Sequence, residues 1–128
     1  MAADSSDREP RKAAPGEPSE NDARSLRVAF ATAPDGDVAA RIARALVEER
    51  LVACANLVAN VRSIYRWQGR VEDESEVMLI LKTRADRVGA LAERLRALHP
   101  YDLPELLVLP VEDGLAPYVE WVRAETAP

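Results

Sequence analysis

Residues 52–83 read VACANLVANVRSIYRWQGRVEDESEVMLILKT. They divide into two segments, 52–67 and 70–83, on either side of the dipeptide Gln68–Gly69. Branched and aromatic residues in both segments favour β-strand, and a run such as VMLILK is too short between turn signals to predict a helix. Glycine at the second turn position supplies the positive φ that a two-residue hairpin loop requires. This stretch therefore predicts a β-hairpin with two long strands.

The two predicted strands are longer than the domain that carries them. About 13 residues at about 3.3 Å each span about 43 Å. A compact fold of about 100 residues has a radius of gyration near 13 Å and hence a diameter of about 35 Å. We therefore expect the hairpin to bend sharply or to project beyond the core. A projecting hairpin presents unpaired strand edges that pair with another chain, which predicts a homo-oligomer.

A strand and an amphipathic helix precede the hairpin. Residues 26–32 (LRVAFAT) form a short apolar run that ends at the turn residues of 34–37. After this turn, Val38, Ile42 and Leu46 recur at helical spacing, and charged residues occupy the opposite face. The pattern predicts a strand followed by a helix.

A second helix, a strand and a final helix follow the hairpin. Residues 88–98 carry an apolar stripe, and the spacing of Thr83 and Asp86 predicts a capping box before it. Pro100 disfavours helical geometry at His99, so the helix should end there. Residues 104–111 (PELLVLPV) predict the fourth strand, and Pro117 suits the first turn of a last helix. The order is βαββαβ plus a C-terminal helix, which predicts an α+β, ferredoxin-like fold.

Composition limits the classes of partner. The formal net charge of −5 argues against a nucleic-acid binder, and no apolar stretch approaches the length of a membrane span. The single cysteine, Cys54, suits a reducing compartment, and the N-terminus lacks the apolar core of a secretory signal. We therefore expect a cytoplasmic protein with no nucleic-acid or membrane partner.

The chain divides into a tail and one domain. Residues 1–24 contain no Val, Ile, Leu or aromatic residue, so they cannot bury enough apolar surface to offset their ordering entropy. This composition predicts a disordered N-terminal tail at 1–24 and a folded domain at 25–128.

Four segments of the domain resemble the divalent-cation tolerance family, CutA. They are TAPDGDVAARIARALVEERLVACANLV, VRSIYRWQGRVEDESEVMLILKT, LHPYDLPELLVLPV and YVEWV, and they occur in this order from Leu26 onward. The resemblance implies a ferredoxin-like subunit in a tight homotrimer with strands paired between subunits. It also implies a role in the response to metal ions, with copper or another divalent cation bound weakly, and no enzyme activity.

His99 is the only histidine and has two interpretations. The resemblance implies a copper ligand, because the family's proposed ligands include the histidine before PY, often one of a pair, and a cysteine before TAP. Leu98 and Ala31 occupy the other two positions here, so one ligand of three is present. Alternatively, His99 ends a helix, where an imidazolium interacts favourably with the helix dipole.

Cys54 and the acidic run at 72–76 have similar alternatives. A thiolate at Cys54 would suit copper(I), whereas free cysteines are most often small buried apolar residues. The run EDESE supplies carboxylates of the kind that hard cations bind. However, alternate strand residues face opposite ways, and Arg62, Arg66 and Arg70 offer cross-strand ion pairs. A solvated, salt-bridged hairpin is the interpretation that this pattern favours.

A further group combines aromatic residues with charged ones. The resemblance implies that these residues line or border a cleft between subunits, and the group comprises Tyr65, Trp67, Lys82, Tyr101, Glu105 and Trp121. Such a set suits a small-ligand pocket or an interface core. Two alternative functions therefore stand beside metal binding. One is a trimeric small-molecule sensor resembling the PII signal proteins, and the other is a structural interaction module without a ligand.

Overall fold

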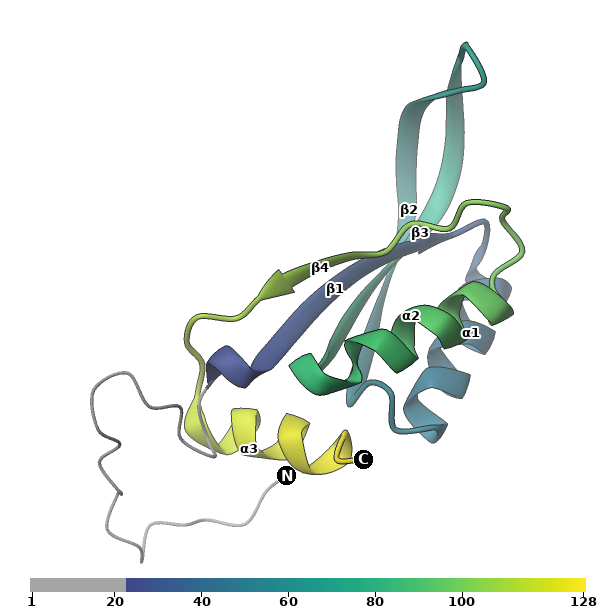
Figure 1. The fold of residues 1–128 in the computed structure, drawn as a ribbon. Coiled ribbons are helices and arrows are strands. Elements are labelled where there is room, and N and C mark those ends of the chain that lie inside the picture. The colour runs from purple at the N-terminus through teal and green to yellow at the C-terminus, as the bar shows by residue number, and fades with distance from the viewer. Residues whose placement is uncertain (1–22) are drawn as a thin grey trace, which may run out of the picture.

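Four antiparallel strands in the order β2-β3-β1-β4 organise residues 23–128, the part of the chain that this computed structural model describes. The strands and helices are β1 (Leu26–Ala33), α1 (Gly36–Glu48), β2 (Cys54–Trp67), β3 (Arg70–Arg84), α2 (Val88–Leu98), β4 (Leu107–Pro110) and α3 (Ala116–Glu125). This order confirms the predicted α+β, ferredoxin-like fold with an added C-terminal helix (Figure 1). The expected tail lies outside the described residues except for Ala23 and Arg24, which belong to a 3₁₀ turn at Ala23–Ser25.

Helices α1 and α2 cover one face of the sheet. Because strand side chains alternate between the faces, every second residue of β1 and β3 points toward these helices. The resulting core is formed by Ala29, Ala31, Ala33, Leu79 and Leu81 from the strands, with Ile42, Leu46, Leu91 and Leu95 from the helices. At the start of α1, the Asp35 carboxylate accepts a hydrogen bond from the Val38 N–H at 2.9 Å, which caps the helix.

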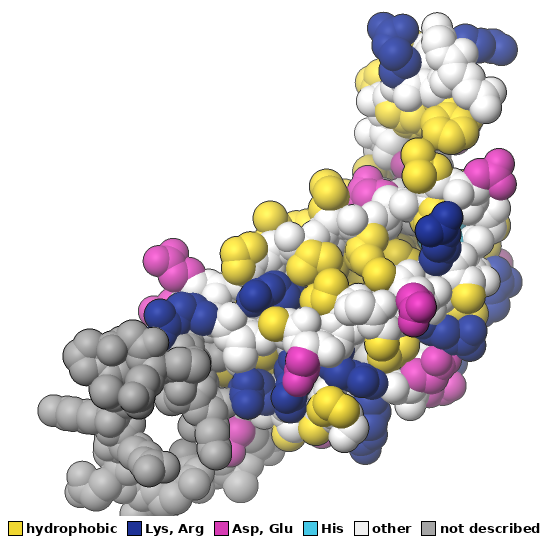
Figure 2. Space-filling model, in the orientation of Figure 1, with side chains coloured by type: hydrophobic (Ala, Val, Ile, Leu, Met, Phe, Trp, Pro, Cys, Tyr) yellow, Lys and Arg dark blue, Asp and Glu magenta, His cyan; other side chains and the backbone are white. Residues whose placement is uncertain are grey.

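The opposite face of the sheet is covered at one end only. There, α3 packs Val119 and Val122 against Leu26 and Ala53. Along β4, the side chains of Leu107 and Leu109 are 64% and 50% exposed. Hydrophobic side chains gather along this part of the molecule (Figure 2). We call the face that carries residues 28, 30, 78, 80, 107 and 109 the open face.

Strands β2 and β3 extend well beyond the rest of the sheet (Figure 1). We call residues 61–76 the arm. The arm begins at an irregularity in the ladder, where Val58 pairs with Met78 but Val61 pairs with Glu76. Asn60, inside this bulge, has a φ of 62°. The hairpin therefore both bends and projects, which are the two outcomes that its length predicts.

The arm ends in a two-residue turn. Gln68 and Gly69 have φ values of 49° and 81°, which is the pair of positive angles of a type I′ turn. The predicted role of Gly69 is confirmed.

Gly69→Val is expected to lower the free energy of unfolding by about 2 kcal/mol, because a branched residue is strained at positive φ. A Cβ at this position would meet no other atom within 4 Å, so the cost arises from the backbone alone. Gly69→Asn is the control, since asparagine tolerates this conformation. Urea unfolding of both variants measures the difference, and equal stability would contradict the left-handed turn.

The predicted capping box at Thr83 is wrong. Thr83 is fully buried in β3, and its hydroxyl donates to the Leu51 carbonyl oxygen at 2.7 Å. Asp86 instead pairs with Arg84 at 2.6 Å, and a 3₁₀ turn at Ala85–Arg87 leads into α2. Because Thr83 points into the core, its hydroxyl does not cap the start of α2. The fourth strand is also shorter than predicted, at Leu107–Pro110 rather than 104–111.

Candidate functional site

His99 follows the last residue of α2, as Pro100 predicts. Its backbone is extended, with φ −83° and ψ 136°, and its side chain is only 7% exposed. The ring Nε2 donates to the Thr32 carbonyl oxygen at 2.6 Å, and Nδ1 accepts from the Tyr101 N–H at 3.1 Å. Because a backbone donor faces Nδ1 and a backbone acceptor faces Nε2, the ring is a neutral imidazole with its proton on Nε2. His99 therefore ties the end of α2 to β1.

These two hydrogen bonds occupy both ring nitrogens of His99. A metal ion binds an imidazole through one unprotonated nitrogen, which here is Nδ1. Coordination would require the Tyr101 N–H to release this atom. The ligand role of His99 thus stays a prediction.

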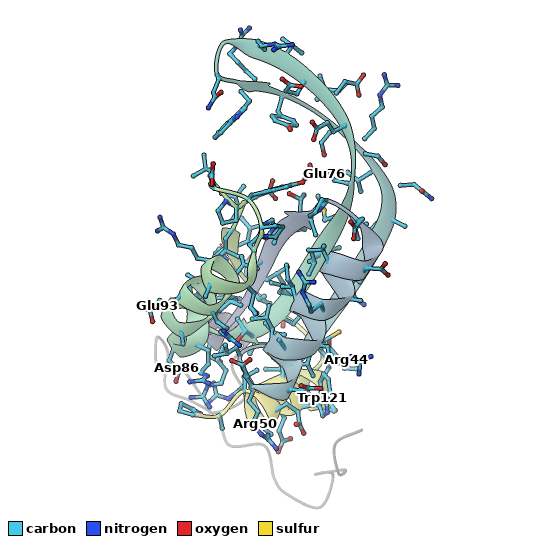
Figure 3. All side chains as sticks on the ribbon, turned by 90° about the vertical axis from the view of Figure 1, so that its right-hand side faces the viewer. Arg44, Arg50, Glu76, Asp86, Glu93 and Trp121 are labelled. Carbon is cyan, nitrogen blue, oxygen red and sulfur yellow. The ribbon has the colours of Figure 1, made fainter. Side chains whose placement is uncertain are left out.

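Tyr101 connects His99 to the arm. The two rings lie 4.7 Å apart, and the Tyr101 hydroxyl donates to Glu76 Oε2 at 2.9 Å. Glu76 is only 7% exposed and lies where the arm leaves the sheet (Figure 3). Burial raises the pKa of the Tyr101 hydroxyl, and the hydrogen bond to Glu76 raises it further. Partial desolvation and then the charge of Glu76 raise the pKa of Glu105. We call His99, Tyr101, Glu76 and Glu105 the root cluster.

Tyr65 lies in the β2 part of the arm, opposite Glu72 of β3. Its hydroxyl donates to Glu74 Oε2 at 3.1 Å. Desolvation, this hydrogen bond and the charges of the neighbouring glutamates raise the pKa of Tyr65. Tyr65 is also the last of the groups that raise the pKa of Tyr101, after burial and the neighbouring glutamates. Of the predicted cleft residues, Tyr101 contacts His99, and Glu105 is connected to Glu76 through the effect of that charge on its pKa.

The other predicted site residues lie elsewhere. Lys82 Nζ lies 3.9 Å from the Cys54 sulfur and also donates to the Asn56 side chain. Desolvation raises the pKa of Tyr118, and the neighbouring Cys54 raises it further. The Tyr118 ring lies 5.6 Å from the Trp121 ring. Figure 3 shows Trp121 near the lower end of the molecule, far from Glu76 at the base of the arm.

Trp67 is also separate from the root cluster. It is the last residue of β2, beside the arm's turn, and its side chain is 41% exposed. Within the described residues of one subunit, the predicted cleft thus divides into three places: the root cluster, the group around Cys54 and the tip of the arm.

Glu74 and Glu76 belong to the run 72–76, whose sequence pattern favoured a solvated hairpin over a cation site. The solvated, salt-bridged interpretation of residues 72–76 holds for Asp73, where the Arg62 guanidinium binds both carboxylate oxygens and lowers the pKa of Asp73. It is wrong for Glu76, which is buried. Its position in the sequence could have indicated this burial. Glu76 is the last acid before the apolar run VMLILK, where the strand enters the core.

Glu105→Gln is expected to stabilise the protein at pH 7 by less than about 1 kcal/mol, since solvent screens an exposed carboxylate. The folded state raises the pKa of Glu105, so the neutral form is favoured on folding and that contribution is lost as pH rises through the raised pKa. The gain should therefore disappear below the pKa of an unfolded glutamate. Thermal unfolding of both proteins from pH 3.5 to about 7.5 tests this, and a gain that persists in acid would contradict it.

Metal ligands do not converge fully in one subunit. Within residues 23–128, no group of three or more His, Cys, Asp and Glu side chains is placed to hold a metal ion. Within the root cluster, the charge of Glu76 raises the pKa of Glu105, and both ring nitrogens of His99 are hydrogen-bonded. Over the same part of the chain, no helix is both long and apolar enough to cross a bilayer.

Known proteins match most of this chain. Residues 27–125 match the family model for the CutA1 divalent ion tolerance protein. Protein CutA of Homo sapiens is 48% identical over 102 residues, which cover 80% of this chain and 57% of that protein. The divalent-cation tolerance protein CutA of Thermus thermophilus is 48% identical over 99 residues, covering 77% of this chain and 96% of that protein. The chain thus spans a little over half the length of the human relative.

A solved structure extends the likeness to the fold. The crystal structure of CutA from Xylella fastidiosa superposes with a TM-score of 0.78 at 43% identity, covering 80% of this chain and 98% of that one. The family model covers residues 27–125, from β1 to α3. This chain belongs to the CutA1 divalent ion tolerance family.

Proposed function

We propose that this protein is a cytoplasmic, non-enzymatic homotrimer that binds divalent cations, including copper, weakly and acts in the response to metal ions. The observation that carries the proposal is the pair of carboxylates in the root cluster. Glu76 is buried, and its charge raises the pKa of the neighbouring Glu105. A divalent cation between them would relieve this repulsion, since carboxylate oxygens are the ligands that hard cations prefer.

The proposed ligands differ in how readily they are available. Glu105 is exposed and Glu76 has one oxygen bonded to Tyr101, so these two would hold the cation. His99 would join them only when its Nδ1 is released by Tyr101. Water or residues of a second copy would complete the coordination shell, which accounts for weak binding. Cys54, near Lys82 rather than near the root cluster, would be a separate, softer site for copper(I).

The test is a calorimetric titration of copper(II), copper(I) and Mg²⁺ into three proteins. Glu105→Gln removes one charged ligand of the root cluster, and we expect about tenfold weaker binding of the divalent ions. Glu93→Gln, an exposed acid on α2, is the matched control and should bind like the unaltered protein. Equal affinities in all three proteins would exclude the root cluster. A fourth protein, His99→Asn, keeps an acceptor for the Tyr101 N–H and tests the histidine, and unchanged copper affinity would remove His99 from the site.

A second candidate is the small-molecule sensor. The Tyr65 and Tyr101 hydroxyls donate to two glutamates of β3, Glu74 and Glu76, and such a set of polar groups suits the orientation of a small ligand. A thermal-shift screen of nucleotides and metabolites tests this candidate, because a ligand that binds the folded state raises the melting temperature. If no compound raises the melting temperature at a concentration well above a plausible Kd, the sensor is excluded.

A further inference from the structure

The ring of His99 is held in one orientation. Its Nε2–H donates to the Thr32 carbonyl oxygen at 2.6 Å, and the side chain is buried. Turning the ring over would leave this buried carbonyl without its donor, which is costly. Nδ1 is therefore the ring nitrogen through which a metal ion could bind. Contact with further copies would only bury the ring more, so this orientation also holds in the proposed homotrimer.

A main-chain group already occupies this nitrogen. The Tyr101 N–H donates to His99 Nδ1 at 3.1 Å. The unprotonated nitrogen of a neutral imidazole has a single lone pair in the ring plane, and a metal ion would use the same one. This hydrogen bond and the coordination of a metal ion by His99 therefore exclude each other.

Two side-chain contacts hold Tyr101 in the position from which its N–H reaches Nδ1. Its ring lies 4.7 Å from the His99 ring, at an interplanar angle of 51°. Its hydroxyl donates to Oε2 of the buried Glu76 at 2.9 Å. Hydrogen bonds to ionised groups are about twice as strong as those between neutral groups. The Tyr101 hydroxyl thus anchors the residue whose main chain covers the imidazole nitrogen.

We propose that Tyr101 determines the cation preference of the root cluster by withholding Nδ1 of His99. While the hydroxyl anchor is in place, the cluster offers carboxylate oxygens, which suit Mg²⁺ and Mn²⁺, and no free imidazole nitrogen, which suits copper(II). Loss of the anchor lets the Pro100–Tyr101 peptide turn away, and the imidazole becomes available to copper(II). This inference rests on the proposed binding of cations at Glu76 and Glu105, and it involves no movement of the arm.

Two tyrosines that donate to glutamates allow a matched test. Tyr101→Phe removes the anchoring hydroxyl and keeps the ring against His99, whereas Tyr65→Phe removes a hydroxyl that donates to Glu74 within the arm. Copper(II) and Mn²⁺ are titrated into the untagged proteins, and Mn²⁺ reports on the carboxylates because it prefers oxygen ligands. Pulsed electron paramagnetic resonance of the copper(II) samples then detects the remote nitrogen of a bound imidazole. His99 is the only histidine in the chain, so this imidazole signal identifies it.

We expect Tyr101→Phe to raise the affinity for copper(II) relative to that for Mn²⁺ by about tenfold and to introduce the imidazole signal. The unaltered protein and Tyr65→Phe should keep the lower ratio and give no such signal. Circular dichroism establishes that both variants are folded. An imidazole signal in the unaltered protein would overturn the inference, because His99 would then be available with Tyr101 in place. Its absence from Tyr101→Phe would overturn it as well.

A failure of the proposed function gives a different result. Glu105→Gln would then bind Mn²⁺ as tightly as the unaltered protein does, and the carboxylates of the root cluster would be excluded as the site. The imidazole signal is read from the copper(II) samples alone, so it decides the role of Tyr101 in either case.

Discussion

His99→Ala is expected to lower the free energy of unfolding by about 3 kcal/mol, because it leaves one buried and one partly buried backbone group without partners. The Thr32 carbonyl loses the Nε2–H donor, and the Tyr101 N–H loses the Nδ1 acceptor. The alanine also removes the ring that packs on Tyr101. Urea unfolding followed by circular dichroism measures the loss.

His99→Asn separates the two hydrogen bonds. An asparagine oxygen takes the place of Nδ1 and accepts from the N–H two residues later, as in an Asx turn. The bond to Thr32 is still lost, so the expected destabilisation is about half that of the alanine variant. If both variants are as stable as the unaltered protein, His99 has no structural role and its use as a ligand becomes the better explanation for its presence.

Ile80→Glu is expected to convert the proposed homotrimer into single subunits at micromolar concentration. Ile80 lies on the open face, between Phe30 of β1 and Asn56 of β2 in the ladder. Burial of apolar surface stabilises an assembly by about 25 cal/mol per Å², and the open face has this surface available in its exposed leucines. A carboxylate at its centre would be buried unpaired on association, at a cost of several kcal/mol.

Size-exclusion chromatography with light scattering gives the masses. Ala90→Glu adds the same charge on the exposed side of α2 and should keep the assembly. Circular dichroism establishes that the Ile80→Glu subunit is folded, since Ile80 is only half-buried in one subunit. A single-subunit mass for the unaltered protein would contradict the homotrimer, and an unchanged mass for Ile80→Glu would show that the open face is not the interface.

The fold was predictable because its signals lie close together in the chain. The spacing in α1, the dipeptide Gln68–Gly69 and the position of Pro100 each report on a few neighbouring residues, and all three predictions agree with the structure. The capping box was wrong because the Thr83 hydroxyl has a distant partner, the Leu51 carbonyl, which lies 32 residues away in the chain. A local spacing rule has no information about such a partner.

The candidate site was predictable only in part. Tyr101 does contact His99, and it donates to Glu76, whereas Lys82 lies in a separate group with Cys54. The burial of Glu76 was unexpected, since five successive polar residues, 72–76, are typical of a solvated strand. Its burial depends on the loop after α2, which brings Tyr101 over the base of the arm.

By itself, the sequence determined the strands, the helices and the turn of the arm, because backbone preference and side-chain alternation are properties of neighbouring residues. Only the tertiary structure decided which side chains meet. The register shows why: Trp67 pairs with Arg70 at the turn, and counting back without an irregularity would place Cys54 opposite Thr83. The extra residue at the bulge shifts the pairing by one residue, so Cys54 lies opposite Lys82. Glu76 lies on the arm side of the bulge, opposite Val61. Such a shift is set by how the bent hairpin packs on the body, and packing involves residues far apart in the chain.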